Sequence, residues 1–287
     1  MVTPSLDART FAIGCGRLMI LALGLASLVL LARLAAAPSK PWRHWRRAAG
    51  ERLSRLPAAR MQPWPLITLL AAGSLLTLVR LHGGSHAAPP LPSGLAIACS
   101  ALLHNGLTVL AVAASLRLSE LSWRGLLGQN RTTIRQTVTA GLRGGVMVMA
   151  PVWLLSQAGL AVLQALGLPP EPQEAFLWLA DVRFGALQRI LLVAIAVIAA
   201  PVVEEIVFRG VLLPVLSRNG SQPLRGILLS SLLFAVLHQH AGSLLPLLGI
   251  GIGCAAGYLA TGSLLTPIVM HALFNAISLL AFHVAGG

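Results

Sequence analysis

The stretch "FGALQRILLVAIAVIAAPVVEEIVFRGVLLPV", residues 184–215, is a long apolar run that carries two adjacent glutamates and an arginine near its C-terminal end. A helix of about 20 apolar residues is long enough to cross a hydrocarbon layer about 30 Å thick, and this run exceeds that length. The chain has only eight acidic residues, so the placement of two of them inside such a run needs an explanation.

The composition indicates a membrane protein. The 287-residue chain is 56% hydrophobic and only 10% charged, and its mean hydropathy is +0.81. Soluble domains have about 25% charged residues, which excludes an ordinary soluble fold. The bilayer therefore replaces a soluble core as the apolar surroundings of this chain.

The apolar runs predict an all-α fold, a polytopic membrane helix bundle with about eight transmembrane helices. The expected spans are 11–37, 64–81, 95–116, 137–166, 184–215, 226–239, 244–260 and 264–285. We expect residues 1–183 to form N-terminal transmembrane helices with basic cytoplasmic loops. Residues 184–287 are expected to form a second unit, a helix bundle that carries the chemistry.

The charges lie mainly in the connections between these spans. The formal net charge of +13 comes from arginines in segments such as 39–60 and 117–136, whereas 169–183 is acidic. Basic loops of membrane proteins face the cytoplasm and its anionic headgroups, so this pattern predicts contact with the lipid bilayer and no nucleic-acid partner. We expect a multi-pass protein of the bacterial inner membrane, with both termini and the acidic connection outside.

Glu204, Glu205 and Arg209 form the first candidate constellation. Glu205 precedes Arg209 by four residues, which places both on one helix face in the favourable order for an ion pair. Glu204 projects about 100° away around the helix and is left out of that pair. A charge inside the bilayer is costly, so such residues usually face a cavity or one another. The alternative is a structural network, or a position where the headgroups begin.

Two further helices carry polar pairs with the same four-residue spacing. Phe234 and His238 lie in the span 226–239, and His271 and Asn275 in the span 264–285. A single histidine on an apolar helix is usually a core or interfacial residue, but three such helices in one C-terminal block favour a site. Pro201, which lies just before Glu204, cannot donate a backbone hydrogen bond and so frees a carbonyl earlier in the helix. It either kinks the helix toward a cavity or is an ordinary membrane proline.

The patterns E-E-x-x-x-R, F-x-x-x-H and H-x-x-x-N, in this order, resemble the CPBP (ABI) intramembrane proteases. This family includes the type II CAAX prenyl endopeptidases and bacteriocin-processing enzymes, and the resemblance covers about residues 184–285. It implies that Glu204 and His238 activate water while His271 and Asn275 bind the oxyanion. Glu205, Arg209 and Phe234 would support the site.

Amide hydrolysis needs a base for water and a donor to the tetrahedral oxyanion, and both interactions are stronger in a water-poor cavity. In an older view of the family, the histidines share a metal, and Glu204, His238 and His271 would make a plausible zinc set. Asn275 argues weakly against zinc, because an amide is a poor zinc ligand and a good oxyanion donor. Zinc and a metal-independent mechanism both remain open at this point.

The sequence therefore favours an intramembrane endopeptidase. Its expected substrate is a hydrophobic peptide or a membrane-anchored protein. One alternative is a non-enzymatic immunity or scaffold protein of the same fold, in which the motifs form a structural polar core. Another is a transporter with a proton relay, which would require symmetric halves with broken helices. Intact motif residues at all four catalytic positions favour the enzyme.

Overall fold

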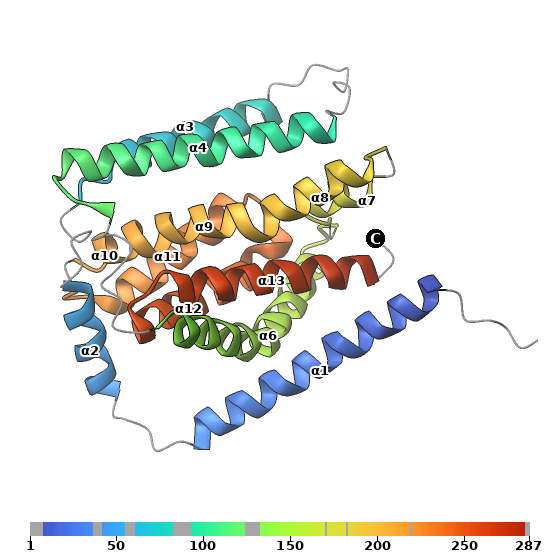
Figure 1. The fold of residues 1–287 in the computed structure, drawn as a ribbon, viewed down its shortest axis with the longest axis horizontal. Helices are drawn as coiled ribbons and strands as arrows, with labels where there is room; N and C mark the ends of the chain where they lie inside the picture. The colour runs from blue at the N-terminus through green and yellow to red at the C-terminus, as the bar shows by residue number, and fades with distance from the viewer. Residues whose placement is uncertain are drawn as a thin grey trace, which may run out of the picture.

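The computed structural model describes residues 8–36, 42–54, 61–82, 93–123, 133–169, 171–181, 183–218 and 220–284. Within these ranges the chain forms helices and connecting turns with no strand, which confirms the predicted all-α class (Figure 1). Parts of the predicted basic connections, at 37–41, 55–60 and 124–132, lie outside the described residues.

Five helical segments are long and apolar enough to cross a membrane, as judged by length and composition over the described residues. They are α4 (Gly94–Leu118), α6 (Ile134–Ala165), Ala186–Leu216, Ala241–Thr261 and α13 (Leu265–Val284). Trp64–Gly73 and Pro223–Leu237 are shorter apolar helical stretches. The protein is thus an integral multi-pass membrane protein, while the predicted number of eight spans is not confirmed.

The N-terminal helices lie on the outside of the bundle (Figure 1). Helix α3 (Trp64–His82) pairs with α4, and α4 in turn lies along α8 (Ala186–Ala194). Helix α1 (Ala8–Ala36) crosses α6 on the opposite side, and the short helix α2 (Trp42–Ser54) contacts α11 (Pro223–Leu237). The motif-bearing helices are therefore covered on two sides.

Helices α6, α12 (Leu244–Thr261) and α13 pack closely through glycines. A Cβ atom on Gly141 of α6 would lie 2.7 Å from Cβ of Val269 on α13, and one on Gly253 of α12 would lie 2.7 Å from Cγ1 of Val148 on α6. Small residues let membrane helices approach one another closely. Helix α6 thereby packs against both α12 and α13, the second of which carries His271 and Asn275.

Residues 184–215 were predicted as one span, and two π-helical segments interrupt its α-helix. It consists of α8, the π-helical η2 (Ile195–Ala199), α9 (Ala200–Glu205), the π-helical η3 (Ile206–Leu212) and α10 (Leu213–Leu216). Pro201 and Pro214 follow closely after the two π-helical segments, and neither has an N–H with which to continue the pattern. Glu204 and Glu205 are the last two residues of α9, the short α-helical segment between the two π-helical ones.

Candidate active site

Glu205 and Arg209 form the predicted ion pair, and both side chains are fully buried. Nη1 of Arg209 donates to Oε1 of Glu205 at 2.8 Å. Its Nη2 donates to the backbone carbonyl of Gly251 on α12, also at 2.8 Å. The arginine thus joins the motif helix to α12 while neutralising the glutamate.

Aromatic rings cover the guanidinium group. Cζ of Arg209 lies 5.1 Å from the ring centroid of Phe234 and 5.9 Å from that of Phe208. The two rings themselves meet edge to face, with centroids 5.1 Å apart. Cation–π contacts are strongest where the cation is desolvated, so the rings help the protein to keep this charge buried.

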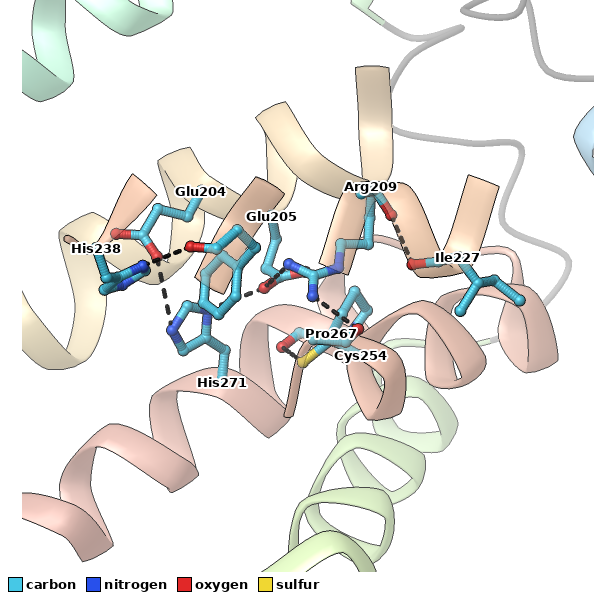
Figure 2. Close-up of polar contacts among 11 residues, drawn as sticks. Glu204, Glu205, Arg209, Ile227, His238, Cys254, Pro267 and His271 are labelled. Atoms are coloured by element: carbon cyan, nitrogen blue, oxygen red, sulfur yellow. Dashed lines mark hydrogen bonds and ion pairs between the residues drawn. The ribbon is translucent and has the colours of Figure 1, made fainter. Parts of the chain in front are cut away.

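His271 lies between the two glutamates and is 2% exposed. Its Nδ1 is 2.9 Å from Oε1 of Glu205, and its Nε2 is 3.6 Å from Oε2 of Glu204. Because a carboxylate only accepts hydrogen bonds, Nδ1 carries a proton and donates it to Glu205. This contact fixes the ring orientation and turns Nε2 toward Glu204 (Figure 2).

Glu204 differs from its neighbour as the helix geometry predicts. Its side chain is 28% exposed, whereas that of Glu205 is fully buried. The arginine binds Glu205 and leaves Glu204 with the contact to His271. The accessible carboxylate is therefore Glu204.

His238 lies at the C-cap of α11, directly after its last helical residue. Nδ1 lies 2.7 Å from the carbonyl oxygen of Phe234, which can only accept, so Nδ1 donates and Nε2 keeps its lone pair. The centroid of the Phe234 ring lies 4.7 Å from that of the His238 ring and 5.3 Å from that of the His271 ring. Phe234 thus links the two histidines and is itself only 1% exposed.

Asn275 lies one turn after His271 on α13. Its Nδ2 donates to the backbone carbonyl of Ala196 in η2 at 2.8 Å. Sequence reasoning did not identify Ala196 or Gly251 as site residues, because each contributes a backbone carbonyl and no side-chain signal. The one available hint was Pro201, which removes a hydrogen-bond donor from the helix.

The zinc set proposed from the sequence was Glu204, His238 and His271. Within the described residues, no three His, Cys, Asp or Glu side chains are grouped so as to hold a metal ion. The bonds made by Nδ1 of His238 and Nδ1 of His271 leave both Nε2 atoms available, but the three side chains are not grouped so as to share an ion. In this arrangement the candidate ligands do not fit a zinc centre, and we derive no step through a metal.

Comparison with family models gave a match over residues 186–277, to the family described as Type II CAAX prenyl endopeptidase Rce1-like. The matched segment contains all the motif residues named above and confirms their resemblance to the CPBP proteases. Comparisons with curated proteins and with solved structures gave no match.

Proposed function

We propose that the protein is an intramembrane endopeptidase that hydrolyses a peptide bond in a hydrophobic peptide or a membrane-anchored protein. The observation that carries this proposal is the difference between the two glutamates. Glu205 is buried and paired with Arg209, whereas Glu204 is partly exposed and not held by the arginine. A partly exposed carboxylate beside His271, with His238 joined to the same group through the Phe234 ring, is suited to act on water.

In the proposed reaction, Glu204 takes a proton from water, and His238 helps to position that water. The bond from His238 Nδ1 to the Phe234 carbonyl leaves Nε2 as a lone-pair acceptor for one of the water protons. Positioned general bases contribute about 10²–10⁴-fold to a rate. The hydroxide then attacks the scissile carbonyl carbon, and when the tetrahedral intermediate collapses the C–N bond breaks as the proton taken from water passes to the leaving nitrogen.

His271 and Asn275 would donate to the resulting oxyanion. The amide nitrogen of Asn275 has two N–H groups, and the Ala196 carbonyl accepts one of them. Nε2 of His271 must carry a proton to donate, and Glu204, which lies 3.6 Å away, can supply the proton it has taken from water. Donors aimed at the developing charge are commonly the largest catalytic contribution.

A non-enzymatic scaffold is the second candidate, because the buried network of Glu205, Arg209 and Gly251 connects helices as a structural core would. The scaffold leaves the accessible Glu204 without a function, and for that reason we favour the enzyme.

The test compares the wild type with Glu204→Gln in detergent, using a quenched library of hydrophobic peptides. Glu171→Gln is the control, because this exposed carboxylate precedes α7 (Glu174–Ala180) and lies outside the site. We expect equal thermal stability for all three proteins, with cleavage lost only in Glu204→Gln. Equal cleavage by the wild type and Glu204→Gln would overturn the assignment. No cleavage by the wild type, with a marked loss of stability in the variant, would favour the scaffold.

A chelator arm of the same assay addresses zinc. Loss of cleavage on chelation and its return with added zinc would support a shared metal, whereas unchanged cleavage supports water activation by Glu204 and His238 alone.

A further inference from the structure

The carbonyl that accepts the amide of Asn275 belongs to a break in the helical hydrogen-bond pattern. In η2 the N–H of Ala200 donates to the carbonyl of Ile195, five residues back. The next amide in this π-helical register would donate to Ala196. Residue 201 is a proline and has no N–H, so the helix leaves the Ala196 carbonyl without a backbone donor.

Asn275 supplies the missing donor from another helix. Its Nδ2 lies 2.8 Å from the Ala196 oxygen, and the side chain is partly buried. The bond fixes one N–H of the amide and with it the plane of the whole group. The second N–H of the same nitrogen remains for another acceptor.

The same arrangement occurs on another helix, α6, among residues that are not part of the site. Pro151 lies inside this helix and cannot donate to the carbonyl four residues back, that of Met147. The hydroxyl of Ser27 on α1 donates to the Met147 carbonyl at 2.8 Å and accepts from the N–H of Ala150 at 3.0 Å. Neighbouring helices commonly satisfy carbonyls freed by membrane prolines.

We propose that Pro201 is a positioning residue for the oxyanion donor. Because Pro201 has no N–H to donate to the Ala196 carbonyl, this carbonyl stays turned toward α13. There it accepts one N–H of the Asn275 amide, and the second N–H of that amide remains available to the substrate. The inference rests on the proposed function for its catalytic consequence, but the anchoring itself is a property of the folded protein.

Pro201→Ala restores a backbone N–H at residue 201. This N–H can donate to the Ala196 carbonyl in the π-helical pattern and align that carbonyl with the helix axis. We expect kcat to fall at least about tenfold with KM nearly unchanged, because a misplaced donor loses much of the roughly 100-fold contribution of an oxyanion-hole group. Asn275→Ala should lower kcat by about 100-fold. The double variant should match Asn275→Ala alone, since both changes remove the same interaction.

Pro151→Ala is the matched control, because it alters the equivalent bond of Ser27, which involves none of the site residues. It should leave kcat unchanged. An equal loss of kcat in Pro151→Ala, or additive losses in the Pro201 and Asn275 double variant, would show that Pro201 acts through general packing and would overturn the proposal.

A spectroscopic arm does not depend on cleavage. In protein labelled with ¹⁵N-asparagine, the resonances that disappear in Asn275→Ala belong to its side-chain amide. In the wild type we expect one of the two Nδ2 protons to exchange much more slowly than the other. In Pro201→Ala we expect the difference to be lost.

Two equally fast protons in the wild type would overturn the anchor even if Pro201→Ala failed to fold. Protection retained in folded Pro201→Ala would overturn the role of the proline. If the wild type cleaves no peptide but shows the expected protection, the proposed function fails and the anchor stands.

Discussion

Glu205 receives two donors on one oxygen, Oε1, from Arg209 and His271. Its other oxygen, Oε2, is buried without a hydrogen-bond partner in the part of the chain that the structure describes. Removing one partner of a buried ion pair leaves an uncompensated charge, and this costs more than the pair itself contributes. The stability of the site should therefore depend strongly on Arg209.

We predict that Arg209→Met lowers the free energy of unfolding by about 3–5 kcal/mol, the range for breaking a buried pair. Combining it with Glu205→Gln should recover part of the loss, because the remaining group is then neutral. Thermal unfolding in detergent measures Arg209→Met, Glu205→Gln and the double variant. A double variant as unstable as the sum of the two single ones would contradict a direct interaction between these residues.

The connection before α8 contains a second, exposed ion pair. The hydrogen bond from Arg183 to Asp181 lowers the pKa of that carboxyl to about 2. A pKa that is lower in the folded state means that this contact stabilises the fold above the unfolded pKa of about 3.9 and is lost as the pH falls toward the folded value. We expect an NMR titration to show a higher pKa of Asp181 in Arg183→Gln than in the wild type, because the side-chain hydrogen bond is its largest cause, and an unchanged low value would contradict the assignment.

The identities of the site residues could be predicted because a charged or polar group in an apolar helix is costly and therefore conspicuous. The spacing also predicted the pairing of Glu205 with Arg209. The contact of Asn275 with Ala196 could not be predicted, since it depends on a π-helical register and on the approach of a distant helix. Similarly, His238 was placed within a helix but lies at its C-cap, because the end of α11 has no sequence signal such as glycine.

Helices α6, α12 and α13 show why the chemistry-bearing helices need a partner from the first half of the chain. A Cβ on Gly141 would meet Cβ of Val269 at 2.7 Å and the backbone oxygen of Thr266 at 2.9 Å. Backbone atoms cannot move aside as a flexible side chain can. The division of the chain near residue 183 stays a prediction, while α6 contacts the motif-bearing helix α13 directly.

We predict that Gly141→Ala destabilises the protein by about 1–3 kcal/mol, as overpacking does in well-packed cores. Gly106→Ala in α4 is the control, because a Cβ there would meet nothing within 4 Å. Alanine should be tolerated at 106, where its helix propensity favours it by about 1 kcal/mol. Thermal unfolding of both variants in detergent decides, and equal stability would show that α6 and α13 do not approach as closely as described.

The two π-helical segments within residues 184–215 show what an apolar run cannot predict about a helix. The run 184–215 predicts a membrane span, and the segment Ala186–Leu216 is long and apolar enough to be one. Hydropathy reports the surroundings of the side chains and does not distinguish α-helical from π-helical hydrogen bonding. Prolines at 201 and 214 were the local signals, and only the packing around them determines the resulting geometry.

Charge separates the two ends of the molecule. Helix α2 has exposed Arg47 and Arg52, and Arg52 donates from Nη1 to the Ala260 carbonyl at 2.6 Å, near the C-terminal end of α12. The turn after α10, with exposed Arg218, lies at this same end, where a Cβ on Gly50 would approach the Gly220 oxygen to 2.6 Å. The acidic segment with α7 lies at the opposite end (Figure 1).

Positive charge is retained on the cytoplasmic side of a membrane, so we predict that the turn after α10 is cytoplasmic and the segment before α7 is outside. In a variant with Cys15, Cys99 and Cys254 replaced, Glu171→Cys should react with an impermeant maleimide on intact bacterial cells. Ser221→Cys should react only after permeabilisation. Both positions are exposed, so poor access within the protein does not explain a difference. The reverse pattern would place the basic end outside and contradict the predicted orientation.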